Sequence, residues 1–351
     1  MVRLTKEQLN NASSYNNPLG FVQLENVEME DLGLEKYDVI ESYDYDGHTI
    51  KNFYRVNSSI FQSVFDEIAN NPECSFVTPY NNIVKEGIVP EKVSVLIKDT
   101  HHHLEERVSS QILNYYGVAC PVNVSLVGDE IFKEDIKKLP NKENAIRFRN
   151  MTSGLTGYYA YTISMDFMSE GDSLETFAND DENVIFFTSI YDSIDRVRTK
   201  IQEVVGNKKL GKLAKQKLAT QLEDEYVMSL LVRKVICCDS DFNTNNIAIL
   251  SGKNPKIINF DFELSLGRSA NQGNSFELMK EVKDKYPNVW DKFLSKSNDL
   301  YERMTNTDEK TIRRILKNPQ IHKSLQANLK FVSDCAKVNF GVRDSNHKLS
   351  M

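Results

Sequence analysis

The stretch from residue 239 to residue 267 places acidic and amide side chains around two short apolar runs. Asp241 and Asn246 stand five positions apart in DFNTNN, and Asp261 follows the second run, KIINF. Both runs have the composition of β-strands and are joined by the turn SGKNP, which predicts a β-hairpin. The hairpin keeps the three polar side chains in a fixed relation to one another.

These three side chains suit phosphoryl transfer with a divalent cation. Mg²⁺ prefers oxygen ligands, and phosphoryl transfer depends mainly on positioning and on neutralising phosphate charge. We therefore expect Asp241 to accept the proton of the attacking hydroxyl, and Asn246 and Asp261 to bind Mg²⁺. The alternative is a polar turn beside an ordinary hairpin. The order of the two runs, and the position of Asp261 at the end of the second, favour the phosphate site.

A lysine and a glutamate upstream complete the predicted phosphate site. VSVLIK, from Val93 to Lys98, alternates between two faces and predicts a strand that ends at the lysine. The next segment, HLEERVSSQILNYY, has apolar residues at helical spacing, and Gly117 follows it as a C-cap. We expect Glu106 to pair with Lys98. Glu105 is the alternative partner, and an exposed helix start beside a surface lysine is the alternative structure.

An extended segment further along the chain is a candidate contact for the adenine ring. The run from 158 to 168 is apolar and β-prone, and SEGD then interrupts it. Met165, Asp166, Phe167 and Met168 are the predicted hinge between two lobes. A core strand without ligand contact explains the same run equally well. After the interruption, the pattern predicts a helix beginning at LETF.

In this order the segments resemble the HipA-like and CtkA-like serine/threonine kinases of bacteria. The matching pieces are VLIK at Lys98, ERVSSQILNYYGV from Glu106, DSDFNTNN and FDFELSL, within about residues 90–270. The resemblance implies an α+β, two-lobed protein-kinase-like fold with a small β-rich N-terminal lobe and a larger, mostly helical C-terminal lobe. ATP and Mg²⁺ would bind between the lobes. It also implies a protein substrate with a serine or threonine acceptor, with the chain itself as one candidate, and an antitoxin or other regulatory partner within a toxin–antitoxin system.

Some positions depart from the family pattern. Phe242 and Asn243 follow Asp241 where the family has Arg-His, and Glu263 replaces the glycine of the metal-binding triplet. Neither change removes a metal ligand. No phosphate loop is assigned, because Gly87 alone precedes the lysine strand in TPYNNIVKEGIVPEK. Two alternatives stay open: a nucleotide-binding pseudokinase that acts as a binding module, and a kinase for a phosphoinositide-like lipid or a small molecule, whose motif pair is similar.

Length and composition agree with two lobes. The chain has 351 residues, of which 40% are hydrophobic, so it can bury two cores. We expect a mixed N-terminal extension of the small lobe over 1–90, the rest of the small nucleotide-binding lobe with the hinge over 91–168, and a large helical catalytic lobe over 169–351. Strands are expected at AIRFRNM and in a hairpin centred on Asp46 and Gly47.

The same numbers restrict partners and location. A formal net charge of −7 argues against direct binding of nucleic acid. No apolar run approaches the roughly 18 residues of a membrane span, and the polar start lacks a secretory signal pattern. Five cysteines without a C-x-x-C pair are expected to be reduced. The sequence therefore predicts a cytoplasmic protein without a membrane span.

Overall fold

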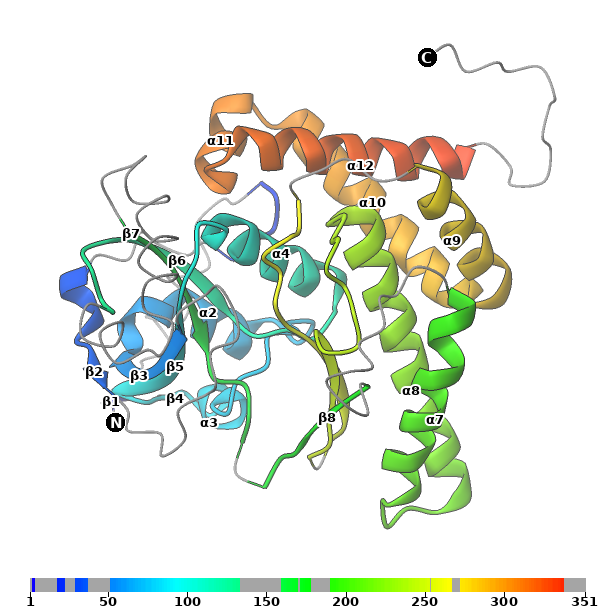
Figure 1. Cartoon of the computed structure of the whole chain (residues 1–351), viewed down its shortest axis with the longest axis horizontal. Helices are drawn as coiled ribbons and strands as arrows, with labels where there is room; N and C mark the ends of the chain where they lie inside the picture. The colour runs from blue at the N-terminus through cyan, green and yellow to red at the C-terminus, as the bar shows by residue number, and fades with distance from the viewer. Residues whose placement is uncertain are drawn as a thin grey trace, which may run out of the picture.

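The computed structural model describes residues 2–3, 18–22, 29–36, 51–132, 159–169, 171–177, 190–252, 254–266 and 272–337. Within these residues, a β-sheet with a few helices lies beside a larger helical part (Figure 1). The α+β, two-lobed arrangement expected from the sequence is confirmed. The strand predicted at AIRFRNM and the turn at Asp46 and Gly47 lie outside the described residues.

The small lobe is built on a five-stranded antiparallel sheet. Its strands, in spatial order, are β2 (Glu35–Lys36), β3 (Lys51–Asn57), β5 (Lys92–Asp99), β7 (Tyr159–Met165) and β6 (Asn123–Gly128). Val93, Val95 and Ile97 of β5 are buried, as the alternating pattern predicted. β2 and β3, from the first predicted region of the chain, share this sheet with β5 and β7 from the second.

Short elements surround this sheet. They are β1 (Val2–Arg3), which pairs with β4 (Ile88–Val89), the 3₁₀ turns η1 (Met29–Leu32) and η2 (Ser58–Phe61), and the helices α2 (Gln62–Asn70), α3 (Asn81–Lys85) and α4 (His103–Tyr116). α4 packs against β6 and β7 on one side and against the helical lobe on the other (Figure 1). It ends at Gly117, whose φ of +80° is the left-handed C-cap conformation predicted from the sequence.

A second, three-stranded sheet lies beside the helical lobe. Its strands are β8 (Leu174–Thr176), β9 (Ile247–Leu250) and β10 (Lys256–Asn259), with β9 in the centre. The predicted hairpin is therefore present, with Asn259 opposite Ile247. The helix predicted at LETF is wrong. Leu174 pairs with Leu250 of β9 and packs against the buried cluster formed by this sheet, and such tertiary pairing outweighs a short local pattern.

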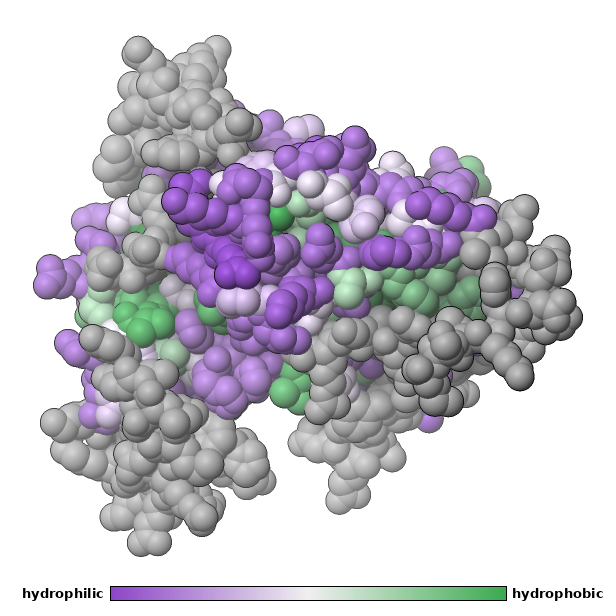
Figure 2. All heavy atoms as spheres, turned by 90° about the horizontal axis from the view of Figure 1, so that it is seen from above, coloured by the Kyte–Doolittle hydropathy of each residue, from purple (hydrophilic) through white to green (hydrophobic). Residues whose placement is uncertain are grey.

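Helices make up the large lobe. They are α7 (Ile190–Gly206), α8 (Lys212–Leu231), the π-helical turn η4 (Val232–Ile236), α9 (Gln272–Lys285), α10 (Pro287–Asn306), α11 (Glu309–Leu316) and α12 (Pro319–Lys337). α10 packs against α12 through one apolar stripe on each helix, while polar residues face outward. Figure 2 shows one face of the molecule, on which hydrophilic side chains predominate among the coloured residues and hydrophobic side chains form less extensive areas.

The end of α8 leads directly into the segment that carries Asp241. Residues 226–231 are all buried, and η4 continues the helix with one wider turn. The five cysteines are free thiols. A helix long and apolar enough to cross a membrane is absent from the described parts of the chain.

Candidate functional site

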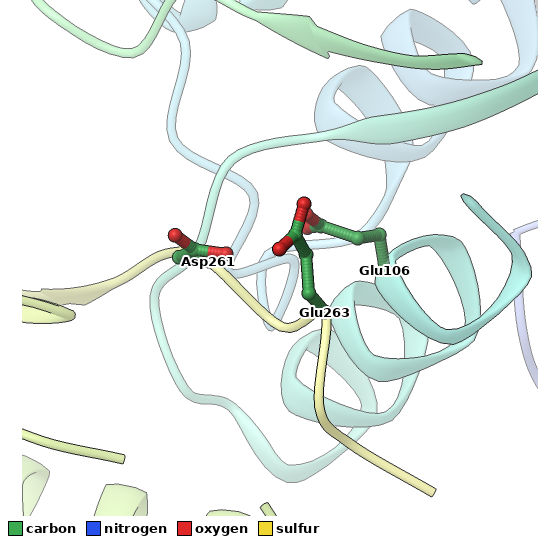
Figure 3. A group of neighbouring side chains, drawn as sticks. All are labelled: Glu106, Asp261 and Glu263. Atoms are coloured by element: carbon green, nitrogen blue, oxygen red, sulfur yellow. The ribbon is translucent and has the colours of Figure 1, made fainter. Parts of the chain in front are cut away.

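Lys98 lies at the end of β5 and contacts three carboxylates. Its Nζ is 3.1 Å from Glu106 Oε1, 3.0 Å from Asp261 Oδ1 and 2.7 Å from Glu263 Oε1. Figure 3 shows the three acidic side chains directed toward one another, one from α4 and two from the segment after β10. Their ligand atoms lie within 4.8 Å of one another. Burial lowers the pKa of Lys98, but the carboxylates outweigh it and hold the pKa above its ordinary value.

Glu106 is fixed inside the protein rather than at its surface. It is 3% exposed, and its Oε2 accepts hydrogen bonds from Asn123 Nδ2 and from the Phe262 N–H, both at 3.3 Å. Burial raises the pKa of Glu106, and the nearby Lys98 opposes that rise. The described ion pairs join Lys98 to Glu106 and not to Glu105.

Asp261 projects into the same group from an unusual backbone conformation. Its φ is +57°, in the left-handed region that aspartate tolerates better than most residues. Burial raises the pKa of Asp261, but Lys98 reverses this and holds the pKa below its usual range. The side chain therefore stays ionised at neutral pH, the form that binds a hard cation.

Asp241 and Asn246 form a second, hydrogen-bonded group. Asn246 Nδ2 donates to the Asp241 carbonyl at 2.7 Å and to Asp241 Oδ2 at 3.1 Å, which leaves the amide oxygen Oδ1 as the atom suited to a cation. Asn243 Nδ2 donates to Asp241 Oδ1 at 3.2 Å, and the Asp241 N–H donates to Asp239 Oδ1 at 2.9 Å. Burial raises the pKa of Asp241, and the nearby carboxylates add to this. A raised pKa brings the carboxylate closer to what a general base needs.

A fully buried arginine, Arg233 in η4, connects the two groups. Its Nε donates to Asp239 Oδ2 at 2.7 Å, and its Nη1 donates to the carbonyls of Asn246 at 2.8 Å and Phe260 at 3.1 Å. Its Nη2 donates to the Asp261 carbonyl at 2.7 Å. One guanidinium thus sets the backbone positions of both proposed metal ligands.

The sequence reasoning did not identify Arg233. Its guanidinium lies 4.5 Å from the ring centroid of Phe242 and 4.8 Å from that of Phe262. Phe242 and Asn243, the residues that depart from the family's Arg-His, therefore contact Arg233 and Asp241 respectively. The available signal was the pair of charged residues Arg233 and Lys234 inside the apolar run VMSLLVRKVICC, because a buried arginine needs a buried partner.

Met165 is the last residue of β7, and the other three predicted hinge residues follow it in the segment before β8. The Met165 N–H donates to the Val122 carbonyl at 2.9 Å, and the Asp166 N–H donates to the Ser94 carbonyl at 3.0 Å. The backbone N–H groups of Met165 and Asp166 are therefore already hydrogen-bonded to carbonyls of the small lobe.

The last two hinge residues, Phe167 and Met168, pack against the apolar cluster of the three-stranded sheet. The Phe167 ring stacks on Phe260 with centroids 6.0 Å apart, and both hinge side chains pack on a buried group that includes Ala248 and Ile258. An apolar wall of this kind suits a flat aromatic ligand. Contact with adenine remains a prediction.

The residues present fit Mg²⁺. Asn246 and Asp261 supply the amide and carboxylate oxygens that this cation prefers, and Arg233 holds the two backbones in one network. Glu106 and Glu263 add two carboxylates around Lys98. When bound there, Mg²⁺ would neutralise phosphate charge.

Comparison with known proteins gives distant structural likeness. No protein-family model matches the sequence, and no curated protein matches it. The chain is similar to the solved structure of a Helicobacter pylori proinflammatory kinase, CtkA, with a TM-score of 0.36 and 11% identity over 72% of this chain and 90% of that chain. It is also similar to the Golgi casein kinase, with a TM-score of 0.35 and 10% identity over 96% of this chain and 91% of that chain. At these values, the functional argument depends on the chain's own residues.

Proposed function

We propose that this chain is a kinase that transfers the γ-phosphoryl group of ATP to a hydroxyl in the presence of Mg²⁺. The main support for this proposal is the Lys98–Glu106 ion pair at 3.1 Å. Lys98 Nζ also lies 3.0 Å from Asp261 Oδ1. A lysine held by a helical carboxylate, beside a carboxylate that stays ionised, is the charge arrangement that binds a metal-complexed triphosphate.

Each side chain has a defined part in this proposal. Lys98 contacts phosphate oxygens, and Glu106 orients it. Asn246 and Asp261 hold the cation. Asp241 takes the proton of the acceptor hydroxyl while the hydroxyl oxygen forms a bond to the γ-phosphorus. The bond between the γ-phosphorus and the β,γ-bridging oxygen breaks, and ADP is released. The raised pKa of Asp241 supports this role.

The proposed acceptor is a serine or threonine of a protein, with the chain itself as one candidate. The order of the four motifs in the sequence supports this choice, as does their resemblance to HipA-like kinases. The same resemblance supports an antitoxin or other regulatory partner, which stays a proposal. The cytoplasmic location expected from the sequence pattern stays a proposal as well.

A second candidate is a nucleotide-binding module without turnover. The contact between Glu263 and Lys98 at 2.7 Å favours this candidate, because a carboxylate already lies beside the ammonium group that a phosphate would contact. Nucleotide binding without phosphate transfer would distinguish this candidate from the kinase.

The test is phosphate transfer from γ-labelled ATP with Mg²⁺, without and with a generic protein acceptor. The variants are Asp241→Asn and Asp261→Asn, and the matched control is Asp291→Asn, an exposed aspartate of α10. Label in the wild type and control that disappears in both variants supports the kinase. No label, but a Mg²⁺-dependent rise of melting temperature with ATP, supports the binding module. If both the label and the rise of melting temperature are absent, the nucleotide site is overturned.

A further inference from the structure

Lys98 has as many carboxylate neighbours as it has N–H donors. Nζ donates hydrogen bonds to Glu106 Oε1 at 3.1 Å and to Asp261 Oδ1 at 3.0 Å, and Glu263 Oε1 lies 2.7 Å from Nζ as an ion pair without a hydrogen bond. With all four groups ionised, the cluster carries a formal charge of −2. A phosphate oxygen that approaches Lys98 therefore meets a lysine that three carboxylates already surround inside a negative cluster, so one carboxylate has to leave.

Glu106 cannot be the one that leaves. Its side chain is 4% exposed, and Asn123 and the Phe262 N–H hold its second oxygen. Moving it away would strand a buried charge without its partner, which is strongly unfavourable.

Asp261 is held as well, through its backbone. Its side chain is 37% exposed, but its carbonyl accepts a hydrogen bond from Arg233 Nη2 at 2.7 Å, and its Oδ1 accepts one from Lys98 at 3.0 Å. In the proposed function, Asp261 stays in place as a ligand that would hold the cation.

Glu263 is the carboxylate free to move. Its side chain is 25% exposed, against 4% for Glu106, and its one ion pair among the described residues, with Lys98, is not a hydrogen bond, whereas Glu106 and Asp261 both accept one. It also has one more rotatable bond than an aspartate, so it can turn toward solvent without moving the backbone.

We propose that Glu263 competes with the nucleotide's phosphates for Lys98, so that a triphosphate binds only as Glu263 swings away. The inference rests on the proposed function and adds to it: Glu263 sets the affinity for the phosphate chain rather than the rate of the chemistry. Glu263→Gln removes the negative charge that a triphosphate must displace. We expect it to bind ATP about tenfold more tightly than the wild type, which corresponds to about 1.4 kcal/mol.

The experiment is isothermal titration of the full chain with ATP, with tripolyphosphate and with adenosine, each in Mg²⁺ and in EDTA. Glu105→Gln is the matched control, because it removes a negative charge from α4 without an ion pair to Lys98. The tighter binding should occur in Glu263→Gln with ATP and tripolyphosphate, and be absent with adenosine and in the control. Melting curves without ligand check that each variant is folded.

Three outcomes would overturn the inference. Equal ATP affinity in wild type and Glu263→Gln removes the competition but leaves the nucleotide site standing. Weaker binding of Glu263→Gln in Mg²⁺ alone would make Glu263 a metal ligand instead. No binding of ATP or tripolyphosphate by either protein overturns the proposed function together with the inference.

Discussion

Arg233 and Asp239 form an ion pair in which neither side chain has any solvent exposure. The aspartate also accepts the N–H of Asp241, while the arginine holds the carbonyls of Asn246 and Asp261. The pair therefore joins the segment that carries the proposed base to the segments that carry the proposed metal ligands. Its loss should affect the fold and the site together.

Breaking this pair should be costly and strongly non-additive. Arg233→Met or Asp239→Asn each strand a buried charge or donor group, and we expect each to lower the free energy of unfolding by roughly 3–5 kcal/mol. The double variant should cost clearly less than the two single losses together. Urea denaturation of the four proteins measures this. The exposed pair of Arg313 and Glu309 is the control, and its disruption should cost less than about 1 kcal/mol. Additive losses at the buried pair would contradict the structural interpretation.

Asp241→Asn should affect catalysis far more than binding. The amide cannot accept the hydroxyl proton, so we expect kcat for phosphate transfer to fall roughly 100- to 10,000-fold. The KM for ATP should stay close to that of the wild type, because Asp241 has no hydrogen bond or ion pair with Lys98 or its carboxylates among the described residues. Because burial raises the pKa of Asp241 above 3.8, the acidic limb of the kcat profile should lie above that pH and vanish in the variant. A variant with wild-type kcat would exclude Asp241 as the base.

Asp261→Asn should uncouple ATP binding from Mg²⁺. In the wild type, titrations in Mg²⁺ and in EDTA should give clearly different affinities, since the carboxylate holds the cation that the phosphates share. In the variant, the two affinities should approach each other. Asp291→Asn should behave like the wild type. An undiminished Mg²⁺ effect in Asp261→Asn would place the cation elsewhere.

His103 should make the protein less stable under mild acid. Burial lowers the pKa of His103 from 6.5 to about 4, with Arg107 as the next cause, and the ring bonds to the Ser125 hydroxyl. Between pH 6.5 and about 4, the unfolded chain takes up a proton at this residue and the folded chain does not. The free energy of unfolding therefore falls across that window, by up to roughly 3 kcal/mol, and levels off below it.

The measurement is the unfolding free energy of wild type and His103→Gln from pH 8 to pH 4. Glutamine keeps a polar group near Ser125 but does not titrate, so the difference between the two proteins isolates His103 from the other histidines. The wild type should lose stability more steeply toward acid than the variant. Parallel curves would show that His103 does not titrate differently on folding.

Local sequence patterns predicted the parts of the site that depend on one or two neighbouring elements. The alternation in VSVLIK places Lys98 at a strand end, and the helical spacing after it places Glu106 within reach. β9 and β10 are joined by a short turn, so their pairing could also be predicted from the sequence. In these cases, the partner residues are close in sequence or fixed by a regular element.

The remaining features depend on groups that are distant in sequence. β8 pairs with a strand more than seventy residues away, so nothing near LETF distinguishes a strand from a helix start. Arg233 became interpretable once the carbonyls of Asn246, Phe260 and Asp261 were seen to converge on it. Glu263 was recognised as a departure, but its contact with Lys98 follows from how the two lobes meet.

The backbone of Asp261 affects how this position is best probed. With φ at +57°, the residue sits in a region that asparagine and glycine enter readily and that alanine enters at a cost. An alanine scan here would mix a conformational penalty with the loss of the carboxylate. Asparagine keeps the backbone preference and removes only the charge, so it is the substitution whose effect on metal binding is interpretable. The position is constrained twice, once by its carboxylate and once by the bend of the chain that carries it.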